Sequence, residues 1–92
     1  MEEPALSFIA FVLSLASTAA IHFGDLPDPE SGERAEPNLA GAAQLIDILA
    51  LLEQKTRGNL TAEERQVLEQ VLYELRLRFV DVKDGRKRII EP

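Results

Sequence analysis

The sequence predicts an all-α protein in which three helices form one domain over residues 1–92. Apolar residues recur at steps of three and four along most of the chain, which is the period of an amphipathic helix. Stretches rich in Pro and Gly, which interrupt helices, separate these segments. We expect an N-terminal apolar helix over 5–23, an acidic Pro-rich linker over 24–37, an antiparallel helical hairpin from helices over 38–57 and 62–80, and a basic tail over 81–92.

Composition narrows the possible functions. Apolar residues make up 46% of the chain and aromatic residues 5%, so the core should be aliphatic. The net charge of −6 argues against a general nucleic-acid binder, because phosphate binding needs a basic face. The chain has no Cys and a single His, which excludes thiolate metal sites and disfavours a zinc site. We therefore expect no metal, no cofactor and no small-molecule substrate.

The most apolar run, PALSFIAFVLSLASTAAIHF at 4–23, allows three interpretations. A secretory signal would need Lys or Arg before the run, where this chain has Glu2 and Glu3. A membrane helix needs about 20 mostly apolar residues, and Ser, Thr and His side chains dilute this run. The favoured interpretation is a helix packed within the protein. Its large apolar side chains should meet a core, and its small ones, from Ser7 to Thr18, should form a separate stripe. Gly24 should end this helix.

The linker GDLPDPESGERAEPN combines three Pro, two Gly and five acidic residues. Pro removes backbone donors and disfavours helix, so we expect a loop. The acidic spacing does not match a calcium-binding loop. A solvated loop is the favoured interpretation, with docking of a basic partner as the alternative.

Local signals explain most of the joint LLEQKTRGNLTAEE at 51–64. Gly58 should supply a left-handed stop, and Thr61 with Glu64 should form a capping box at the next helix. The turn does not require the side chains of Lys55, Thr56 and Asn59, which makes these three the candidate docking residues of the joint.

The third helix carries two apolar stripes rather than one. The second stripe, Tyr73, Leu77 and Val80, lies nearly opposite the expected core stripe. A surface helix of a monomer usually keeps one apolar face, so we predict a homo-oligomer, with a two-fold dimer favoured. Scattered surface apolar residues are the alternative explanation. The predicted oligomer interface consists of Phe8, Phe11, Leu15, Tyr73, Leu77 and Val80.

Asp47 lies inside the apolar segment LIDILALL, which suggests a buried charge. A buried carboxylate needs a partner, and Arg76 has the reach to provide paired donors. We predict a structural Asp47–Arg76 pair, with Tyr73 as the alternative donor.

The tail holds Asp84-Gly85 between two short apolar runs, which is a hairpin-turn signal. Because a lone hairpin is marginal, a disordered tail is an equal alternative. Four basic residues here (Lys83, Arg86, Lys87 and Arg88) are interpreted as a solvated end, although they would also suit an acidic partner, lipid head groups or RNA.

Two long segments resemble a bacterial family known as domain of unknown function 1844. They are SFIAFVLSLASTAAIHFGDLPDP at 7–29 and NLAGAAQLIDILALLEQKTRGNLTAEERQVLEQVLYELRLRFV at 38–80. His22-Phe23-Gly24 stands where the family usually has Leu-Gly, and Arg57 replaces a common Lys. The resemblance implies a small, mainly helical bacterial protein and no activity. The residues that match its pattern include Asp47, Lys55, Thr56, Gly58, Asn59 and Arg76.

These observations favour a non-enzymatic, cytoplasmic interaction or scaffold module that self-associates and has a further, unidentified protein partner. The alternative is a membrane-associated protein anchored by the helix at 5–23. Nucleic acid is the least favoured partner.

Overall fold

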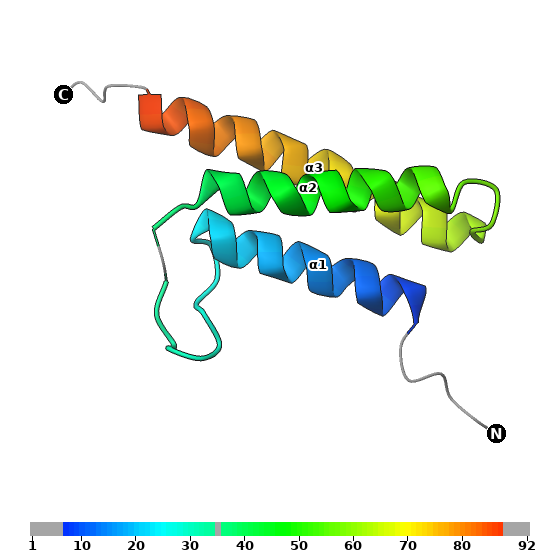
Figure 1. The fold of residues 1–92 in the computed structure, drawn as a ribbon, viewed down its shortest axis with the longest axis horizontal. Helices are drawn as coiled ribbons and strands as arrows, with labels where there is room; N and C mark the ends of the chain where they lie inside the picture. The colour runs from blue at the N-terminus through cyan, green and yellow to red at the C-terminus, as the bar shows by residue number, and fades with distance from the viewer. Residues whose placement is uncertain (1–6, 35, 88–92) are drawn as a thin grey trace.

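The computed structural model describes residues 7–34 and 36–87. These residues form three helices, α1 (Phe8–Phe23), α2 (Leu39–Lys55) and α3 (Ala62–Lys87). Each helix packs against both of the others, and α2 runs antiparallel to α1 and α3 (Figure 1). No strand occurs within the described ranges. The predicted all-α class is therefore confirmed, and the described chain is a three-helix bundle.

Both ends of α1 follow from residues beside them. At its start, the Ala10 N–H donates to Ser7 Oγ at 3.0 Å, so Ser7 caps the helix. At its end, Gly24 has a φ of 84°, and the Asp25 N–H reaches back to the Ala20 carbonyl at 2.9 Å. The predicted end at Gly24 is confirmed, whereas the predicted first two residues lie outside the described part. Among the described residues, no helix is long and apolar enough to cross a membrane.

The joint between α2 and α3 has the predicted signals. Gly58 adopts a left-handed φ of 87°. The Glu64 N–H donates to Thr61 Oγ1 at 3.0 Å, and the Thr61 N–H donates to Glu64 Oε1 at 2.9 Å. This reciprocal pair is the capping box, so that prediction is confirmed.

The C-terminal part of the chain corrects the hairpin prediction. α3 continues through Asp84-Gly85 to Lys87 rather than ending at residue 80. Val82 packs against the core, and Gly85 is not among the glycines with a positive φ. A type I′ turn needs positive φ values and a paired strand, and helical continuation instead keeps every N–H in the i→i−4 pattern. The remaining tail, 88–92, lies outside the described residues.

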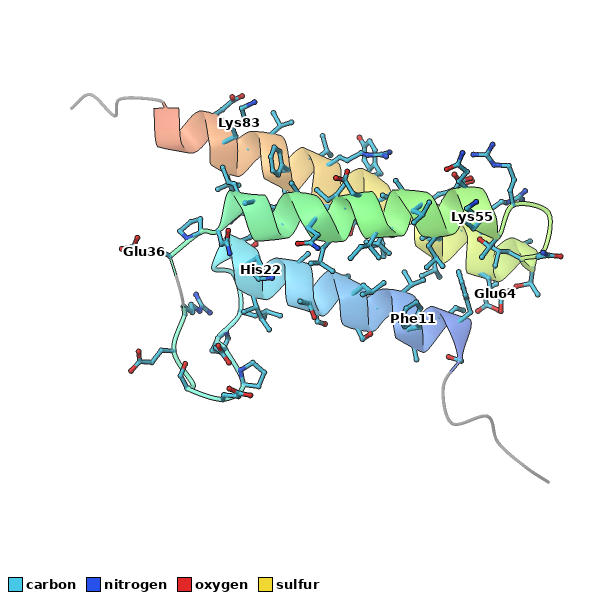
Figure 2. All side chains as sticks on the ribbon, in the orientation of Figure 1. Phe11, His22, Glu36, Lys55, Glu64 and Lys83 are labelled. Carbon is cyan, nitrogen blue, oxygen red and sulfur yellow. The ribbon has the colours of Figure 1, made fainter. Side chains whose placement is uncertain are left out.

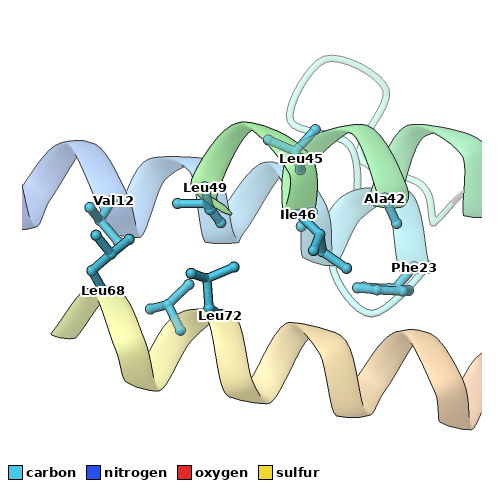
Figure 3. Packing of buried hydrophobic residues seen from close by; sticks show 10 residues of the cluster. Val12, Phe23, Ala42, Leu45, Ile46, Leu49, Leu68 and Leu72 are labelled. Carbon is cyan, nitrogen blue, oxygen red and sulfur yellow. The ribbon is translucent and has the colours of Figure 1, made fainter. Parts of the chain in front are cut away.

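The core is aliphatic, as predicted, and every helix contributes to it (Figure 3). Leu49 of α2, Leu68 of α3 and Val12 of α1 are its largest fully buried side chains. Phe23 is the aromatic member and lies 2% exposed at the end of α1. The ten buried residues are Val12, Ala19, Phe23, Ala42, Leu45, Ile46, Leu49, Leu68, Val71 and Leu72.

The linker returns from α1 to α2 in a folded loop (Figure 1). A turn closes within it, since the Gly32 N–H donates to the Asp28 carbonyl at 2.6 Å. At its far end the Asn38 N–H donates to the His22 carbonyl at 2.6 Å. This bond brings the start of α2 beside the end of α1.

Candidate functional site

An open groove runs between α2 and α3 and is lined by these two helices alone. It consists of two adjoining hollows with volumes of about 250 and 240 Å³. The first is lined by Ala43, Ile46, Asp47, Arg76, Phe79 and Val80. The second is lined by Ala50, Glu53, Glu69, Leu72, Tyr73 and Arg76. Because Arg76 borders both hollows, they adjoin each other along the two helices.

An apolar stripe stands on the α3 side of this groove. Tyr73 is 61% exposed, and Leu77 and Val80 are each 53% exposed. Their spacing of four and three residues puts them on one face of α3, while the core stripe of the same helix is buried. The predicted second apolar face is therefore present, and the bundle of the same chain leaves it uncovered.

The structure corrects the predicted buried charge. Asp47 and Arg76 are both exposed, and neither belongs to an ion pair of the described residues. At about 100° per residue, Asp47 lies roughly 160° around α2 from the buried Leu49. The apolar sequence neighbours of Asp47 suggested burial, but the rotation of α2 points its carboxylate outward. Asp47 and Arg76 do line the same hollow of the groove.

The three α1 residues of the predicted interface are less exposed than the three of α3. Phe8 and Leu15 are half-buried and pack against the core of their own chain. Phe11 is also half-buried (Figure 2). The exposed side of α1 is the predicted small-residue stripe, formed by Ser7, Ala10, Ser14, Ser17 and Thr18, together with Leu13. Apart from Leu13, α1 therefore presents small, mostly hydroxylated side chains to the outside, whereas α3 presents three large apolar ones.

The joint offers fewer unused side chains than predicted. The Thr56 hydroxyl donates to the Leu52 carbonyl at 2.8 Å, beside the bond that the Thr56 N–H makes to the same oxygen at 3.0 Å. Thr56 therefore ends α2 at Lys55, two residues before the predicted end at 57. Lys55, labelled in Figure 2, and Asn59 are exposed. Docking at these two residues stays a prediction.

One polar contact joins segments that are far apart in the sequence and was not predicted. Arg78 of α3 donates from Nε and Nη2 to the two carboxylate oxygens of Asp25, at 2.8 and 2.5 Å. These hydrogen bonds hold the pKa of the Asp25 carboxyl below its ordinary value. The residues are 53 positions apart, so no local pattern connects them. In the sequence, only the acidic linker and the arginines of the third helix pointed to a contact of this kind.

The described ranges hold few other charged or polar groups that could form a functional site. No three His, Asp or Glu side chains gather there as metal ligands would. At the joint, Arg57 Nη2 lies 2.8 Å from Oε1 of Glu53, four residues before it. The hydrogen bond from Arg57 lowers the pKa of the Glu53 carboxyl. The α2–α3 groove with its apolar stripe is thus the principal candidate surface.

One family model matches most of the chain. The family model described as "Domain of unknown function (DUF1844)" matches residues 5–81. The chain belongs to this family. The match spans α1, the linker, α2 and α3 as far as Asp81, so the family pattern covers the groove and the capping box of the joint. No curated protein and no solved structure matches the chain.

Proposed function

We propose that this member of the family is a non-enzymatic helical interaction module and that a second copy of the chain is one of its partners. The supporting observation is the exposed stripe of Tyr73, Leu77 and Val80. Single apolar residues are common on protein surfaces, but contiguous apolar patches mark sites of association. Here three large side chains share one helix face beside an open groove.

The other exposed large apolar residues of the described part form no face of three, although Ile48 and Leu51, three residues apart on α2, share a face of two. Leu13 lies on α1, Leu26 in the linker, and Ile48 and Leu51 on α2. Of the large apolar residues of α1 that would serve as a membrane anchor, Phe8, Val12, Leu15 and Phe23 lie in or against the bundle core. This packing supports our proposal of a cytoplasmic module, and the exposed stripe of α3 supports association through the α2–α3 side.

The test is the mass of the full chain in solution, measured by multi-angle light scattering over a range of micromolar concentrations. A dimer would have twice the 10.2 kDa of the chain. The double variant Leu77→Gln, Val80→Gln should shift the population toward monomer while its circular dichroism stays helical, because both side chains are exposed.

The matched control is Leu13→Gln, which replaces a leucine that is 48% exposed on α1. We expect this variant to keep the mass of the wild type. A folded wild-type chain that stays at 10.2 kDa at every concentration would refute self-association.

A further inference from the structure

We infer that the second copy seats on the α2–α3 groove about a two-fold axis, so that Asp47 of each copy pairs with Arg76 of the other. This inference rests on the proposed self-association and specifies its surface and register. It starts from an asymmetry between the two sides of the groove, which differ in both side-chain size and charge.

Around the middle of the groove, the outer residues of α2 are two alanines with one acid between them, and those of α3 are two larger apolar residues with one base between them. Glu53 of α2 and Glu69 of α3 line the second hollow farther along. On α2, Ala43, Asp47 and Ala50 follow one another at steps of four and three residues. On α3, Tyr73, Arg76 and Val80 follow at steps of three and four. Each set therefore occupies one face of its helix, with its charged residue in the middle.

The antiparallel hairpin sets these two series side by side in opposite directions. Ala43 and Val80 share the first hollow, and Ala50 and Tyr73 share the second. Asp47 lies between the two alanines along α2, and Arg76 borders both hollows. The groove thus has a centre, at the level of the two charged residues, with a small-against-large pair on either side.

A two-fold axis that runs along the groove, between two facing copies, exchanges the sides of the groove and keeps its direction. The α3 side of one copy then lies over the α2 side of the other at the same level. Tyr73 of each copy comes over Ala50 of the other, and Val80 comes over Ala43. A self-complementary surface of this kind is what a two-fold interface requires, because the same patch serves both subunits. Large side chains meet small ones on either side of the two charged residues, which permits close packing.

The charges match in the same arrangement. Asp47 and Arg76 border one hollow, yet none of the ion pairs within the described residues includes either of them. The two-fold places each carboxylate opposite a guanidinium of the other copy, twice per dimer. Such pairs select partner and register more than they add affinity, since removing charges from water is costly. A foreign helix would need to match this charge order by coincidence, whereas a second copy supplies it by symmetry.

The test uses two charge reversals, Asp47→Arg and Arg76→Asp, in the full chain. Each variant alone carries two like charges in its groove and faces like charges on an identical copy. We expect each to weaken homodimerisation at least about tenfold, because like charges opposed at an interface are strongly unfavourable. An equimolar mixture should recover the dimer. The arginine introduced in the first variant would meet the aspartate introduced in the second, and the native Arg76 of the first would meet the native Asp47 of the second.

The mixture is decisive because a pair within one chain cannot produce the same result. Neither variant contains an acid and a base at these two positions, so recovery requires contact between chains. Light scattering gives the mass, and circular dichroism checks that each exposed substitution leaves the helices intact. Glu74→Arg serves as the control, because Glu74 is an exposed acid on α3 that lines a hollow between α1 and α3. It should leave the dimer unchanged.

Each remaining outcome overturns a different statement. If the wild type and both variants dimerise equally, the register is wrong and self-association stands. The register is also wrong if the variants are monomeric and the mixture does not recover. A wild-type chain that is monomeric throughout overturns the proposed function as well, and would leave the groove to a different protein.

Discussion

Arg78 of α3 holds the carboxylate of Asp25, two residues beyond the end of α1, through a pair of hydrogen bonds. Nε donates to Oδ2 at 2.8 Å and Nη2 to Oδ1 at 2.5 Å, and Nη1 also reaches Asp81 at 3.0 Å. The guanidinium therefore fastens the start of the linker to the third helix. The side chains of Arg78 and Asp25 are 40% and 37% exposed, so solvent screens the pair substantially.

Asp25→Asn tests the contribution of this contact. We expect the free energy of unfolding at pH 7 to fall by no more than about 1 kcal/mol, the range of exposed ion pairs. The hydrogen bonds from Arg78 in the folded protein lower the pKa of Asp25 below its ordinary value of 3.8. The stabilisation is thus present above about pH 4 and is lost as the pH falls through the lower folded pKa. Urea unfolding of both proteins at pH 7, 4 and 2 measures the difference, which should be smallest at the lowest pH. The control is Glu36→Gln, an equal loss of charge at an exposed linker residue. An equal effect of both substitutions would assign it to net charge instead.

Gly85→Ala distinguishes a helical end from a hairpin turn. A methyl group added at Gly85 meets no heavy atom within 4 Å. In a helix, Ala is favoured over Gly by up to about 1 kcal/mol, with a smaller gain near the terminus. We therefore expect a slightly raised midpoint of urea unfolding and unchanged or increased helicity by circular dichroism. In an Asp-Gly turn the same change would be destabilising, because Ala disfavours a positive φ. A lowered midpoint would contradict the helix.

The ends of α1 and α2 should be energetically coupled through His22 and Gly41. A Cβ at Gly41 would lie 2.8 Å from His22 Nδ1 and 2.9 Å from its Cε1, too close without a shift of the ring. Gly41→Ala should therefore bring little or none of the helix-propensity gain of about 1 kcal/mol in the wild type. In the His22→Ala background part of the gain should appear, because the Asn38 Nδ2 that would lie 2.9 Å from the new Cβ remains. A double-mutant cycle by urea unfolding measures the coupling. Effects that add to within about 0.5 kcal/mol would show that the imidazole moves away freely.

The capping box at the joint should contribute a measurable part of the stability. Thr61→Ala removes the acceptor of the Glu64 N–H, and we expect a loss of about 1 kcal/mol in the free energy of unfolding. Glu63→Ala is the control, because Glu63 also lies in the first turn of α3 but forms no part of the reciprocal pair. Chemical denaturation at neutral pH gives both values. A loss for Thr61→Ala no larger than that for Glu63→Ala would mean that the cap contributes no more than one first-turn charge.

The features that could be predicted are those that depend on neighbours in the chain. The stop at Gly58 and the reciprocal bonds of Thr61 and Glu64 involve residues within three positions of one another. The second apolar face of α3 could also be predicted, because the helical period alone sets Tyr73 and Leu77 apart from the core stripe. In contrast, the end of α3 was misjudged: the turn signal at Asp84-Gly85 needs a second strand that the bundle does not supply.

The sequence by itself thus determined the three helices, the capping signals between them, the aliphatic core and the family. The tertiary structure alone decided which way each helix faces: Asp47 points outward, Phe8 and Leu15 turn inward, and Arg78 rather than Arg76 meets an acid of its own chain. The physical reason is the range of the forces involved. Capping bonds and periodicity act within one or two helical turns, whereas the rotation of a helix about its axis is settled only when its side chains pack against two neighbours at once.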